Sequence, residues 1–378
     1  MSTSEGDRLR VALDATPLLG ARTGVGAFAS ALIERLAERT QVVVTTYGVT
    51  WRGRHHLVGA VPAGVDVCRR PMAARPLRWA WERAAFPPLE WWTGPVDVAH
   101  GTNFVVPPTA RAAAVVTVHD LTSLHHPELC DAATLAFPSL LRRALARGAW
   151  VHAVSRFVAE EVVSHLGADP ERVVAIHSGV PPAAPARPGD GRRLAGAERY
   201  VLSLGTVEPR KDLPLLVRAF DAVAGVRPEV RLVIAGPDGW GAEALRQALD
   251  AAHHRDRIVR LGWVEDDQRS GLVGDATVLA YPSRYEGFGF PPLEAMAAGV
   301  PVVATSAGAL PEVLGDAATL VAPGDVDALA SALAGLLDDE ARRDAHVEAG
   351  HRQVRAYDWD TTADAMVDLY RQAAVERR

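Results

Sequence analysis

Residues 276–305 read ATVLAYPSRYEGFGFPPLEAMAAGVPVVAT, in which two apolar runs flank a glycine-rich loop and a helical segment. The runs 276–281 and 302–305 are apolar at nearly every position, which is typical of strands buried on both faces of a parallel sheet. Between them, prolines predict the start of a helix over 293–299, and Gly299 followed closely by proline predicts its end. The stretch therefore predicts two parallel strands joined by a helix.

The rest of the chain repeats this alternation of short apolar strands with longer helical stretches. In the first half, we expect strands at 10–13, 41–47, 96–100, 113–119, 150–154 and 172–176. In the second half, we expect them at 200–204, 230–235, 258–261, 276–281, 302–305 and 318–321. Helical periodicity predicts helices at 28–39, 133–147, 155–166 and from 357 onward. The predicted fold class is therefore α/β, with helices covering parallel sheets.

The chain has 378 residues, a length typical of two domains. The stretch 180–196 is rich in proline and glycine and lacks helical periodicity, so it is the best linker candidate. We expect an N-terminal domain over 1–182, a linker over 183–197 and a C-terminal domain over 198–356. The segment 357–378 is expected to be a helix whose apolar side must be buried. Doubly wound domains bind ligands at the carboxyl ends of their strands, which favours a site in a cleft between the two.

The composition is that of a globular protein and excludes several classes. Hydrophobic residues make up 48% and charged residues 23% of the chain, and the formal net charge is -6. A mildly acidic chain is not expected to bind nucleic acid over a broad face. Two cysteines, Cys68 and Cys130, are too few for a disulfide framework. The polar N-terminus does not resemble a signal peptide, and no apolar run approaches the roughly 20 residues of a membrane span, so we expect a cytoplasmic protein.

Lysine occurs only once, at Lys211, within the segment GTVEPRKD at 205–212. A strand is expected to end at Gly205 and a helix to begin near Asp212, which can serve as its N-cap. Arg210 and Lys211 then stand at the positive end of the helix dipole, which is unfavourable unless an anion lies beside them. A diphosphate fits this position, since arginine binds phosphate as a bidentate fork and lysine as a point charge. The alternative is a solvated surface pair.

The loop of residues 281–292 carries a second candidate site. Gly287 and Gly289 allow the backbone to approach a ligand closely, and their N–H groups lie at the positive end of the following helix. Glu286 stands on this loop, and Glu294 lies in an otherwise apolar helix, where its charge requires a partner. Carboxylates are strong acceptors for sugar hydroxyl groups. Taken alone, this pattern also fits an ordinary strand–helix turn, but together with a diphosphate site in the same half it indicates sugar-nucleotide binding.

Several motifs in this order resemble the retaining glycosyltransferases of family 4. In the second half they are GTVEPRK at 205–211, EGFGF at 286–290 followed by Glu294, and GVPVV at 299–303. In the first half they are GVG at 24–26, VHDL at 118–121, VSRF at 154–157 and SGV at 178–180. The resemblance covers nearly the whole chain and implies the GT-B fold, in which two doubly wound, Rossmann-like domains face a central cleft. In this fold, the final helix packs back on the N-terminal domain.

The resemblance implies roles for the matching residues. Arg210 and Lys211 would hold the diphosphate of the donor. Glu286 would bind the hydroxyl groups of the donor sugar, and Glu294 those of the ribose. His119 would face the donor sugar from the N-terminal domain. The implied catalytic residues are thus His119, Glu286, Arg210 and Lys211.

Two glycine segments complete the implied donor site. The backbone of residues 287–289 would meet the sugar or the phosphates, and residues 24–26 would form the opposite wall. The implied donor-binding set consists of Gly24, Val25, Gly26, Arg210, Lys211, Glu286, Gly287, Phe288, Gly289 and Glu294. Asp212 departs from the family, which often has asparagine at this position, and helix capping is the expected reason for the aspartate.

The implied reaction moves a hexose from a nucleoside-diphosphate sugar to a hydroxyl group of a glycan, a lipid-linked glycan or a glycosylated metabolite. The departing diphosphate accepts the proton of the acceptor, and nearby cations stabilise its growing charge, so that no metal or other cofactor is required. Two alternatives stay open, namely an inactive sugar-nucleotide-binding subunit and an epimerase of the same fold. A nicotinamide-dependent oxidoreductase is disfavoured, because Gly24 lies about ten residues after the first strand and not in its turn.

Residues 69–92 combine five arginines with four tryptophans, which suits peripheral contact with an anionic membrane surface. Prolines interrupt any long amphipathic helix there, and the alternative is that the tryptophans pack inside the N-terminal domain or line the acceptor site.

Two patterns that suggest a metal site are set aside. The acidic pair in DWD at 358–360 precedes a helix and does not end a central strand, so it is not expected to bind a metal. His125 and His126 are interpreted as loop residues, because no carboxylate pattern beside them predicts a metal site.

Overall fold

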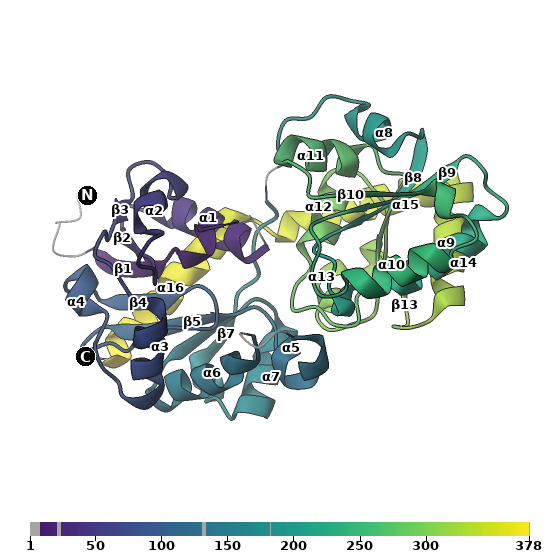
Figure 1. Ribbon diagram of the computed structural model, residues 1–378. Coiled ribbons are helices and arrows are strands. Elements are labelled where there is room, and N and C mark those ends of the chain that lie inside the picture. Colours follow the sequence, from purple (N-terminus) through teal and green to yellow (C-terminus); the bar gives the residue numbers. More distant parts are fainter. Residues whose placement is uncertain (1–7, 21–23, 131–133, 182, 378) are drawn as a thin grey trace. The chain divides into compact units, whose positions relative to one another are not determined.

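The computed structural model describes residues 8–20, 24–130, 134–181 and 183–377. The chain forms two compact units: one combines Met1–Gly179 with Tyr357–Arg378, and the other is Val180–Ala356. Each unit is a parallel sheet with helices packed against it (Figure 1). Most of the polar N-terminus, and Pro182, the last residue of the expected N-terminal domain, lie outside the described residues.

Within the described residues, the first unit contains a seven-stranded sheet whose strand pairs are all parallel. In spatial order its strands are β3 (Asp66–Val67), β2 (Val42–Tyr47), β1 (Leu9–Asp14), β4 (Val98–Gly101), β5 (Ala113–Val118), β6 (Trp150–Ala153) and β7 (Val173–Ala175). Its helices are α1 (Gly24–Ala37), α2 (Arg54–Ala60), α3 (Ala74–Arg83), α4 (Glu90–Thr93), α5 (Thr122–His125), α6 (Phe137–Ala146), α7 (Arg156–Leu166) and α16 (Trp359–Arg377). Short 3₁₀ turns occupy Thr16–Leu18, Pro127–Leu129, Thr134–Ala136 and Pro170–Arg172.

The second unit repeats the same doubly wound plan. The spatial order of its strands is β10 (Ile258–Gly262), β9 (Val230–Ala235), β8 (Arg199–Leu204), β11 (Val278–Tyr281), β12 (Val302–Thr305) and β13 (Thr319–Val321). Its helices are α8 (Asp190–Ala195), α9 (Leu213–Ala224), α10 (Ala242–Ala251), α11 (Asp266–Gly274), α12 (Phe290–Ala297), α13 (Leu310–Leu314), α14 (Val326–Asp338) and α15 (Glu340–Gln353). Short 3₁₀ turns occupy Pro209–Lys211, Arg255–Arg257, Gly315–Ala317 and Val354–Ala356. No helix in the described part of the chain is both long and apolar enough to cross a bilayer.

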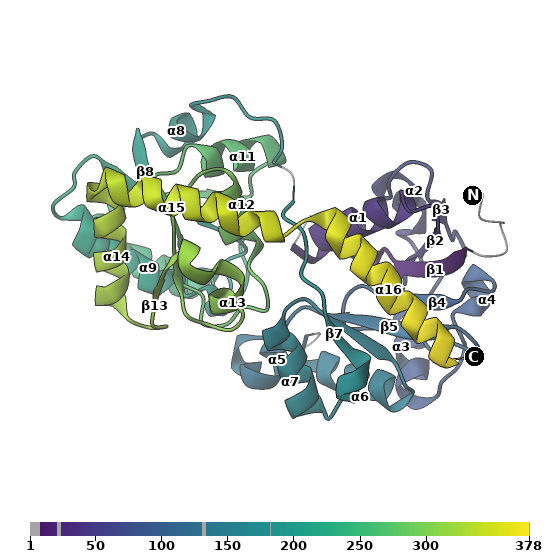
Figure 2. The same ribbon diagram turned by 180° about the vertical axis from the view of Figure 1, so that it is seen from behind.

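The two sheets confirm the predicted α/β class, and every predicted strand is present with small shifts at its ends. The two-residue strand β3 was not predicted, because so short a segment has no readable pattern. The helix predicted over 28–39 begins earlier, at Gly24, so the GVG motif forms the first turn of α1. In the view of Figure 2, α16 lies beside α1 in the first unit, and α15 lies beside α12 in the second.

The stretch expected as a linker over 183–197 contains helix α8 and is packed on the second unit. The Ala184 N–H donates to Ser270 Oγ at 3.0 Å, and the Gly191 N–H donates to Asp275 Oδ2 at 2.9 Å. A Cβ built on Gly191 would lie 2.2 Å from the carbonyl oxygen of Gly271 in α11, so only glycine fits this contact. Partners some 80 residues away along the chain therefore order a segment that shows no helical pattern of its own.

A buried chain of hydrogen bonds ties α16 to the first sheet. The Tyr370 hydroxyl donates to His100 Nδ1, and His100 Nε2 donates to Thr117 Oγ1, both at 2.7 Å. Thr117 Oγ1 donates to His152 Nδ1 at 2.9 Å, and His152 Nε2 donates to the carbonyl of Ile176 at 2.9 Å. With both imidazoles neutral, these directions follow because the last acceptor is a carbonyl oxygen, which requires an N–H at His152 Nε2. Burial lowers the pKa of both rings, that of His152 to about 4, in agreement with neutral histidines.

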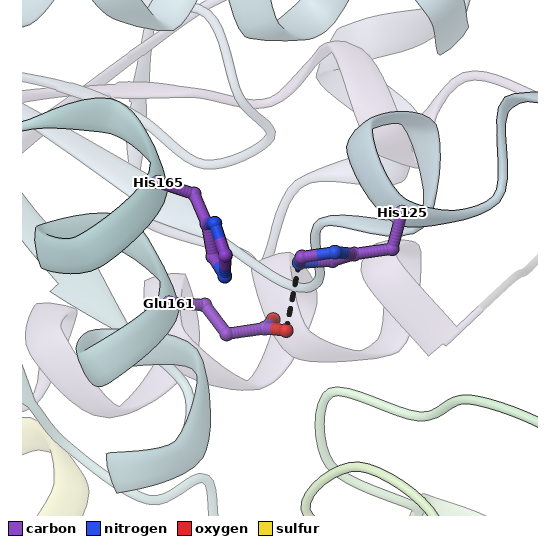
Figure 3. A group of neighbouring side chains, drawn as sticks. All are labelled: His125, Glu161 and His165. Atoms are coloured by element: carbon purple, nitrogen blue, oxygen red, sulfur yellow. Dashed lines mark ion pairs between the residues drawn. The ribbon is translucent and has the colours of Figure 1, made fainter.

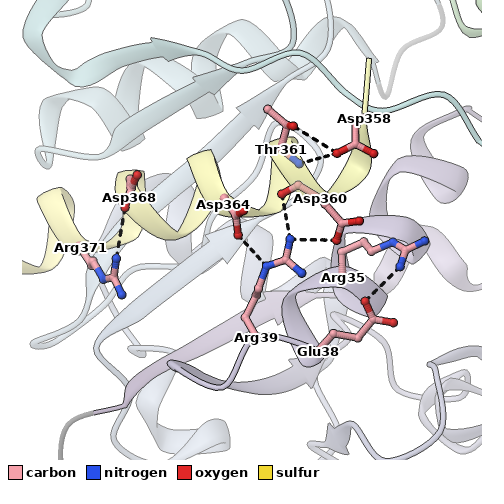
Figure 4. Close-up of polar contacts among 9 residues, drawn as sticks. All are labelled: Arg35, Glu38, Arg39, Asp358, Asp360, Thr361, Asp364, Asp368 and Arg371. Atoms are coloured by element: carbon pink, nitrogen blue, oxygen red, sulfur yellow. Dashed lines mark hydrogen bonds and ion pairs between the residues drawn. The ribbon is translucent and has the colours of Figure 1, made fainter. Parts of the chain in front are cut away.

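Charged contacts hold the start of α16 against the end of α1 (Figure 4). Arg39 donates through Nε to Asp364 at 2.7 Å and forms an ion pair with Asp360 at 2.9 Å. Asp358 accepts hydrogen bonds from the backbone N–H and the hydroxyl of Thr361, as a helix-capping residue does. The DWD segment thus leads into a helix, and its tryptophan, Trp359, is buried.

Gly179 makes a close contact with the start of α16. A Cβ built on Gly179 would lie 2.4 Å from the backbone nitrogen of Trp359 and 2.5 Å from its Cγ. We therefore expect Gly179→Ala to displace the helix start, to cost about 1–3 kcal/mol and to lower the melting temperature measured by circular dichroism. The control is Gly59→Ala in α2, where an added Cβ meets no atom within 4 Å and alanine favours the helix. Equal melting temperatures for the two variants would show that the close approach of Gly179 to Trp359 does not contribute to stability.

Candidate active site

The carboxyl edge of the second sheet brings together two of the predicted polar loops. Strand β8 pairs in parallel with β11. Arg210 and Lys211 follow β8 in a single 3₁₀ turn, and Glu286 follows β11. Because neighbouring parallel strands end at the same edge of a sheet, the side chains of the two loops meet there.

Arg210, Lys211 and Glu286 form one cluster of charges. Lys211 Nζ lies 2.5 Å from Glu286 Oε1, and a terminal guanidinium nitrogen of Arg210 lies 2.7 Å from the same oxygen. Arg210 Nε also donates to Glu208 Oε2 at 2.8 Å. Lys211 Nζ donates to the Tyr281 hydroxyl and lies 4.3 Å from the centroid of its ring. Since Lys211 and Glu286 are only 8% and 6% exposed, the cluster is largely shielded from water.

This cluster contains a counter-anion that was not predicted from the sequence. The anion that Arg210 and Lys211 require is supplied by the chain itself, through Glu286 and Glu208. The two cations are therefore not a solvated surface pair, but they do not by themselves demand a diphosphate. The contact was not predictable because Lys211 and Glu286 are 75 residues apart in the sequence.

Burial and the two cations act in opposite directions on the Glu286 carboxyl. Burial raises its pKa, but Arg210 and Lys211 together outweigh that effect and hold the pKa at about 2. Burial lowers the pKa of the Lys211 ammonium group, and Glu286 compensates only in part. Glu286 is therefore ionised at neutral pH and can act as a hydrogen-bond acceptor.

The backbone around Glu286 and the ring beside Lys211 were not predicted. Gly308 has a φ of +57°, and a Cβ on it would lie 2.2 Å from the Glu286 carbonyl oxygen. The Ala309 N–H donates to that same carbonyl at 2.8 Å. The sequence offered only one indication that these two residues lie at the site, namely that they stand at the carboxyl ends of strands. Tyr281 is the last residue of β11, and Gly308 closely follows β12.

Helix α12 carries the rest of the donor site predicted in this unit. It begins at Phe290, three residues before the predicted start, and residues 287–289 lie buried just before it. Gly289 has a φ of +111°, a conformation that side chains rarely adopt. Glu294 is mostly buried and forms an ion pair with Arg269 of α11. From the sequence, the charge of Glu294 was expected to require a partner in its apolar helix, and Arg269 is that partner.

The predicted capping role of Asp212 is wrong. Asp212 occupies the position before α9, but its side chain makes no capping hydrogen bond. The carboxylate instead forms an ion pair with Arg284 Nε at 2.8 Å, and the backbone has a φ of +44°. Aspartate and asparagine tolerate this left-handed conformation better than most residues, which explains the residue type without a cap.

His119 directly follows β5 in the first unit. Its Nε2 donates to the carbonyl of Thr102 at 2.9 Å, which makes Nδ1 the acceptor atom of the neutral ring. Burial lowers the pKa of His119, in agreement with a neutral imidazole. Phe28 of α1 packs edge-on against the ring, with centroids 5.1 Å apart. The first unit thus places His119 beside the helix whose first turn is Gly24–Gly26.

Asp14 is a further titratable group at the carboxyl edge of the first sheet, and it was not predicted. It ends β1 and is 7% exposed. Its Oδ1 accepts a hydrogen bond from the Thr16 N–H at 2.8 Å. Burial raises its pKa to about 6, although the hydrogen bonds from Thr16 act in the opposite direction. Its protonation therefore changes close to neutral pH.

The low pKa of Glu286 predicts how stability depends on pH. The pKa is about 2 in the folded chain and 4.5 for an ordinary glutamate, so its charge stabilises the fold above pH 4.5, and this contribution is lost as the pH falls toward 2. Glu286→Gln lacks the contribution, which is on the order of 3 kcal/mol, at every pH. We expect the variant to melt below the wild type at about pH 7, and the difference to shrink at about pH 3.5.

The matched control for this experiment is Glu348→Gln, which removes an exposed carboxylate on α15 and should melt with the wild type at both pH values. A difference between Glu286→Gln and the wild type that is unchanged by pH would contradict the assigned ion pairs.

Two protein families match most of the chain. Residues 22–184 match Glycosyltransferase Family 4, and residues 191–353 match Glycosyl transferases group 1. The chain is 31% identical over 282 residues to O-antigen chain mannosyltransferase B of Escherichia coli, and the match covers 72% of this chain and 74% of that protein.

Solved structures share the fold at low sequence identity. Sucrose-phosphate synthase from Thermosynechococcus elongatus has a TM-score of 0.73 at 20% identity, with 97% of this chain and 99% of that chain covered. HepE of Anabaena, solved in complex with UDP-glucose, has a TM-score of 0.68 at 19% identity, with 98% and 99% covered. The sequence matches and the fold together show that the chain belongs to glycosyltransferase family 4 and has the GT-B fold.

Proposed function

We propose that this glycosyltransferase transfers a hexose, with retention of configuration, from a nucleoside-diphosphate sugar to a hydroxyl group of a glycan, a lipid-linked glycan or a glycosylated metabolite. The observation that carries the proposal is the buried cluster in which Arg210 and Lys211 share the carboxylate of Glu286. The UDP-glucose bound by HepE and the O-antigen chain named for the Escherichia coli relative support a nucleotide-sugar donor and a glycan acceptor.

In the proposed donor complex, the diphosphate takes the place of Glu286 beside the two cations. Arg210 can bind two phosphate oxygens as a planar fork, and Lys211 acts as a point charge. Because Glu208 and Glu286 already balance these cations, the diphosphate adds negative charge, which the positive end of the α12 dipole beside residues 287–289 can stabilise. The Glu286 carboxylate then turns to the hydroxyl groups of the sugar.

In the transfer step, the bond between the anomeric carbon and the diphosphate oxygen breaks, and negative charge grows on that oxygen. Arg210, still paired with Glu208, and Lys211, which now faces the diphosphate in place of Glu286, each stabilise this charge by about 3 kcal/mol. The acceptor hydroxyl attacks from the same face of the sugar and gives its proton to the departing oxygen, so the configuration is retained. We propose that these cations make a catalytic metal ion unnecessary.

The other predicted site residues receive supporting roles. The neutral His119 can accept a hydrogen bond from a substrate hydroxyl at Nδ1, because its Nε2 is engaged by Thr102. Glu294, oriented by Arg269, accepts hydrogen bonds from the ribose hydroxyls. The first turn of α1, at Gly24–Gly26, lies at the positive end of the helix dipole and is suited to an anionic part of the substrates.

Two substitutions in the cluster should change nucleotide binding in opposite directions. Lys211→Ala removes a cation and should weaken nucleoside-diphosphate binding. Glu286→Gln removes the anion that competes for the same cations and should strengthen that binding. Both variants, and Glu286→Ala, should lower the transfer rate at least about tenfold, because cations or sugar contacts are lost in the transition state. Calorimetry measures the binding, and product formation measures the rate.

The matched control is Arg246→Ala, which removes an exposed arginine on α10 and should change neither binding nor rate. A folded Glu286→Ala variant with unchanged turnover would remove Glu286 from the mechanism.

A thermal-shift panel of uridine, guanosine, adenosine and deoxythymidine diphosphate sugars, with and without magnesium, identifies the donor and tests metal independence. Donor binding without any transfer would instead favour an inactive binding subunit, and the anomeric configuration of the product tests retention.

We further propose that residues 69–92 contact an anionic membrane surface that presents the acceptor. Trp81 and Trp92 belong to the fold, since their indole N–H groups donate to the carbonyls of Pro87 and Pro71. In contrast, Trp79, Phe86 and Trp91 are 60%, 53% and 57% exposed. The five arginines of the segment are also exposed: Arg69, Arg70, Arg75, Arg78 and Arg83. Exposed aromatic rings among arginines suit the interface of anionic lipids.

Vesicle co-sedimentation tests this surface. The wild type should sediment with vesicles of phosphatidylcholine and phosphatidylglycerol but not with phosphatidylcholine alone, because the attraction is electrostatic. The double variant Trp79→Ser and Trp91→Ser should lose most of this binding. Trp240→Ser, at an exposed tryptophan of the second unit, is the control and should sediment as the wild type does. A wild-type protein that does not sediment with the anionic vesicles would overturn the proposal.

A further inference from the structure

Two histidines and a glutamate converge in the first unit at a place with no role in the proposed reaction (Figure 3). His125 ends α5, while Glu161 and His165 lie four residues apart on α7 and therefore share one face of that helix. His125 Nε2 lies 2.8 Å from Glu161 Oε1. The rings of His125 and His165 stand nearly perpendicular, with centroids 4.6 Å apart. One potential ligand atom from each of the three residues lies within 4.8 Å of the others.

The chemistry of these groups is that of a transition-metal site. Imidazole nitrogen and carboxylate oxygen are ligands of zinc and of neighbouring divalent metals, and three protein ligands leave a coordination position for water. Bonds of about 2.0–2.2 Å to a metal require the three ligand atoms to move closer together. His165 is exposed on α7, so its ring can turn toward the other two, which are partly buried.

We propose that His125, Glu161 and His165 bind a divalent transition-metal ion, with zinc preferred. An ion held by all three residues joins α5 to α7. Because α5 begins just after His119, the ion braces the segment that leads away from that residue. The role is structural, so the site does not conflict with a metal-independent transfer step, and it does not depend on the proposed reaction.

The structure corrects the interpretation of His125 as a loop residue with no carboxylate beside it, since His125 ends α5 and contacts Glu161. The carboxylate comes from Glu161, 36 residues further along the chain, and not from the surrounding loop. The available signal was the Glu-x-x-x-His spacing at 161–165 within a predicted helix, which places two ligands one turn apart.

The test uses the full chain, stripped of metal with a chelator, and zinc alone as the probe. Calorimetric titration should show one zinc ion bound per chain, and cobalt(II) in its place should give the visible absorption of a tetrahedral site. His165→Ala and Glu161→Gln should each weaken zinc binding by at least about tenfold. The matched control is His253→Ala, at an exposed histidine of the second unit, which should bind zinc as the wild type does.

Two results would overturn the proposal. One is a wild type that binds no zinc, and the other is a His165→Ala variant that binds zinc as tightly as the wild type. Circular dichroism checks that each variant is folded, and His165 is exposed, so its loss leaves the core intact. Nucleoside-diphosphate binding should be the same for the wild type and these variants, which separates failure of the metal site from failure of the proposed reaction.

Discussion

The buried carboxylate of Glu286 is the group on which the polar edge of the second unit depends. One of its oxygens contacts both Arg210 and Lys211, and its backbone carbonyl is fixed by Ala309 and by the close approach of Gly308. Removing one partner of a buried ion pair costs about 3–5 kcal/mol, so the three side chains hold one another in place. Cations oriented in this way before a ligand arrives need little reorganisation during a reaction that develops negative charge.

In the first unit, the buried polar side chains are paired through hydrogen bonds between neutral groups and not through ion pairs. The chain from Tyr370 through His100, Thr117 and His152 gives every member a partner in a fixed direction. A fully satisfied buried network is stable, whereas a broken one leaves costly unpaired groups. Because Thr117 lies on β5, the strand that leads to His119, the docking of α16 supports the position of that histidine.

The buried parallel strands were the most predictable feature, because a short apolar run without alternation between turn residues is typical of a strand covered on both faces. Strands β9 and β12 have the predicted ends, whereas α8 was missed, since its order comes from distant partners such as Asp275. The Arg-Lys loop, the Glu286 loop and His119 were predicted as site residues, and their roles with substrates stay predictions. The role of Asp212 was predicted wrongly, because its partner, Arg284, is 72 residues away.

The sequence by itself determined the α/β class, the family and the polar residues that follow particular strands. Hydrophobic periodicity and short motifs are local, and a local pattern can be read from neighbouring residues. Only the tertiary structure decided which charges pair: Lys211 with Glu286, Glu294 with Arg269, and His125 with Glu161. Such pairs join segments that are distant in the sequence, and an ion pair acts over a few ångströms, so strand order and helix packing select each partner.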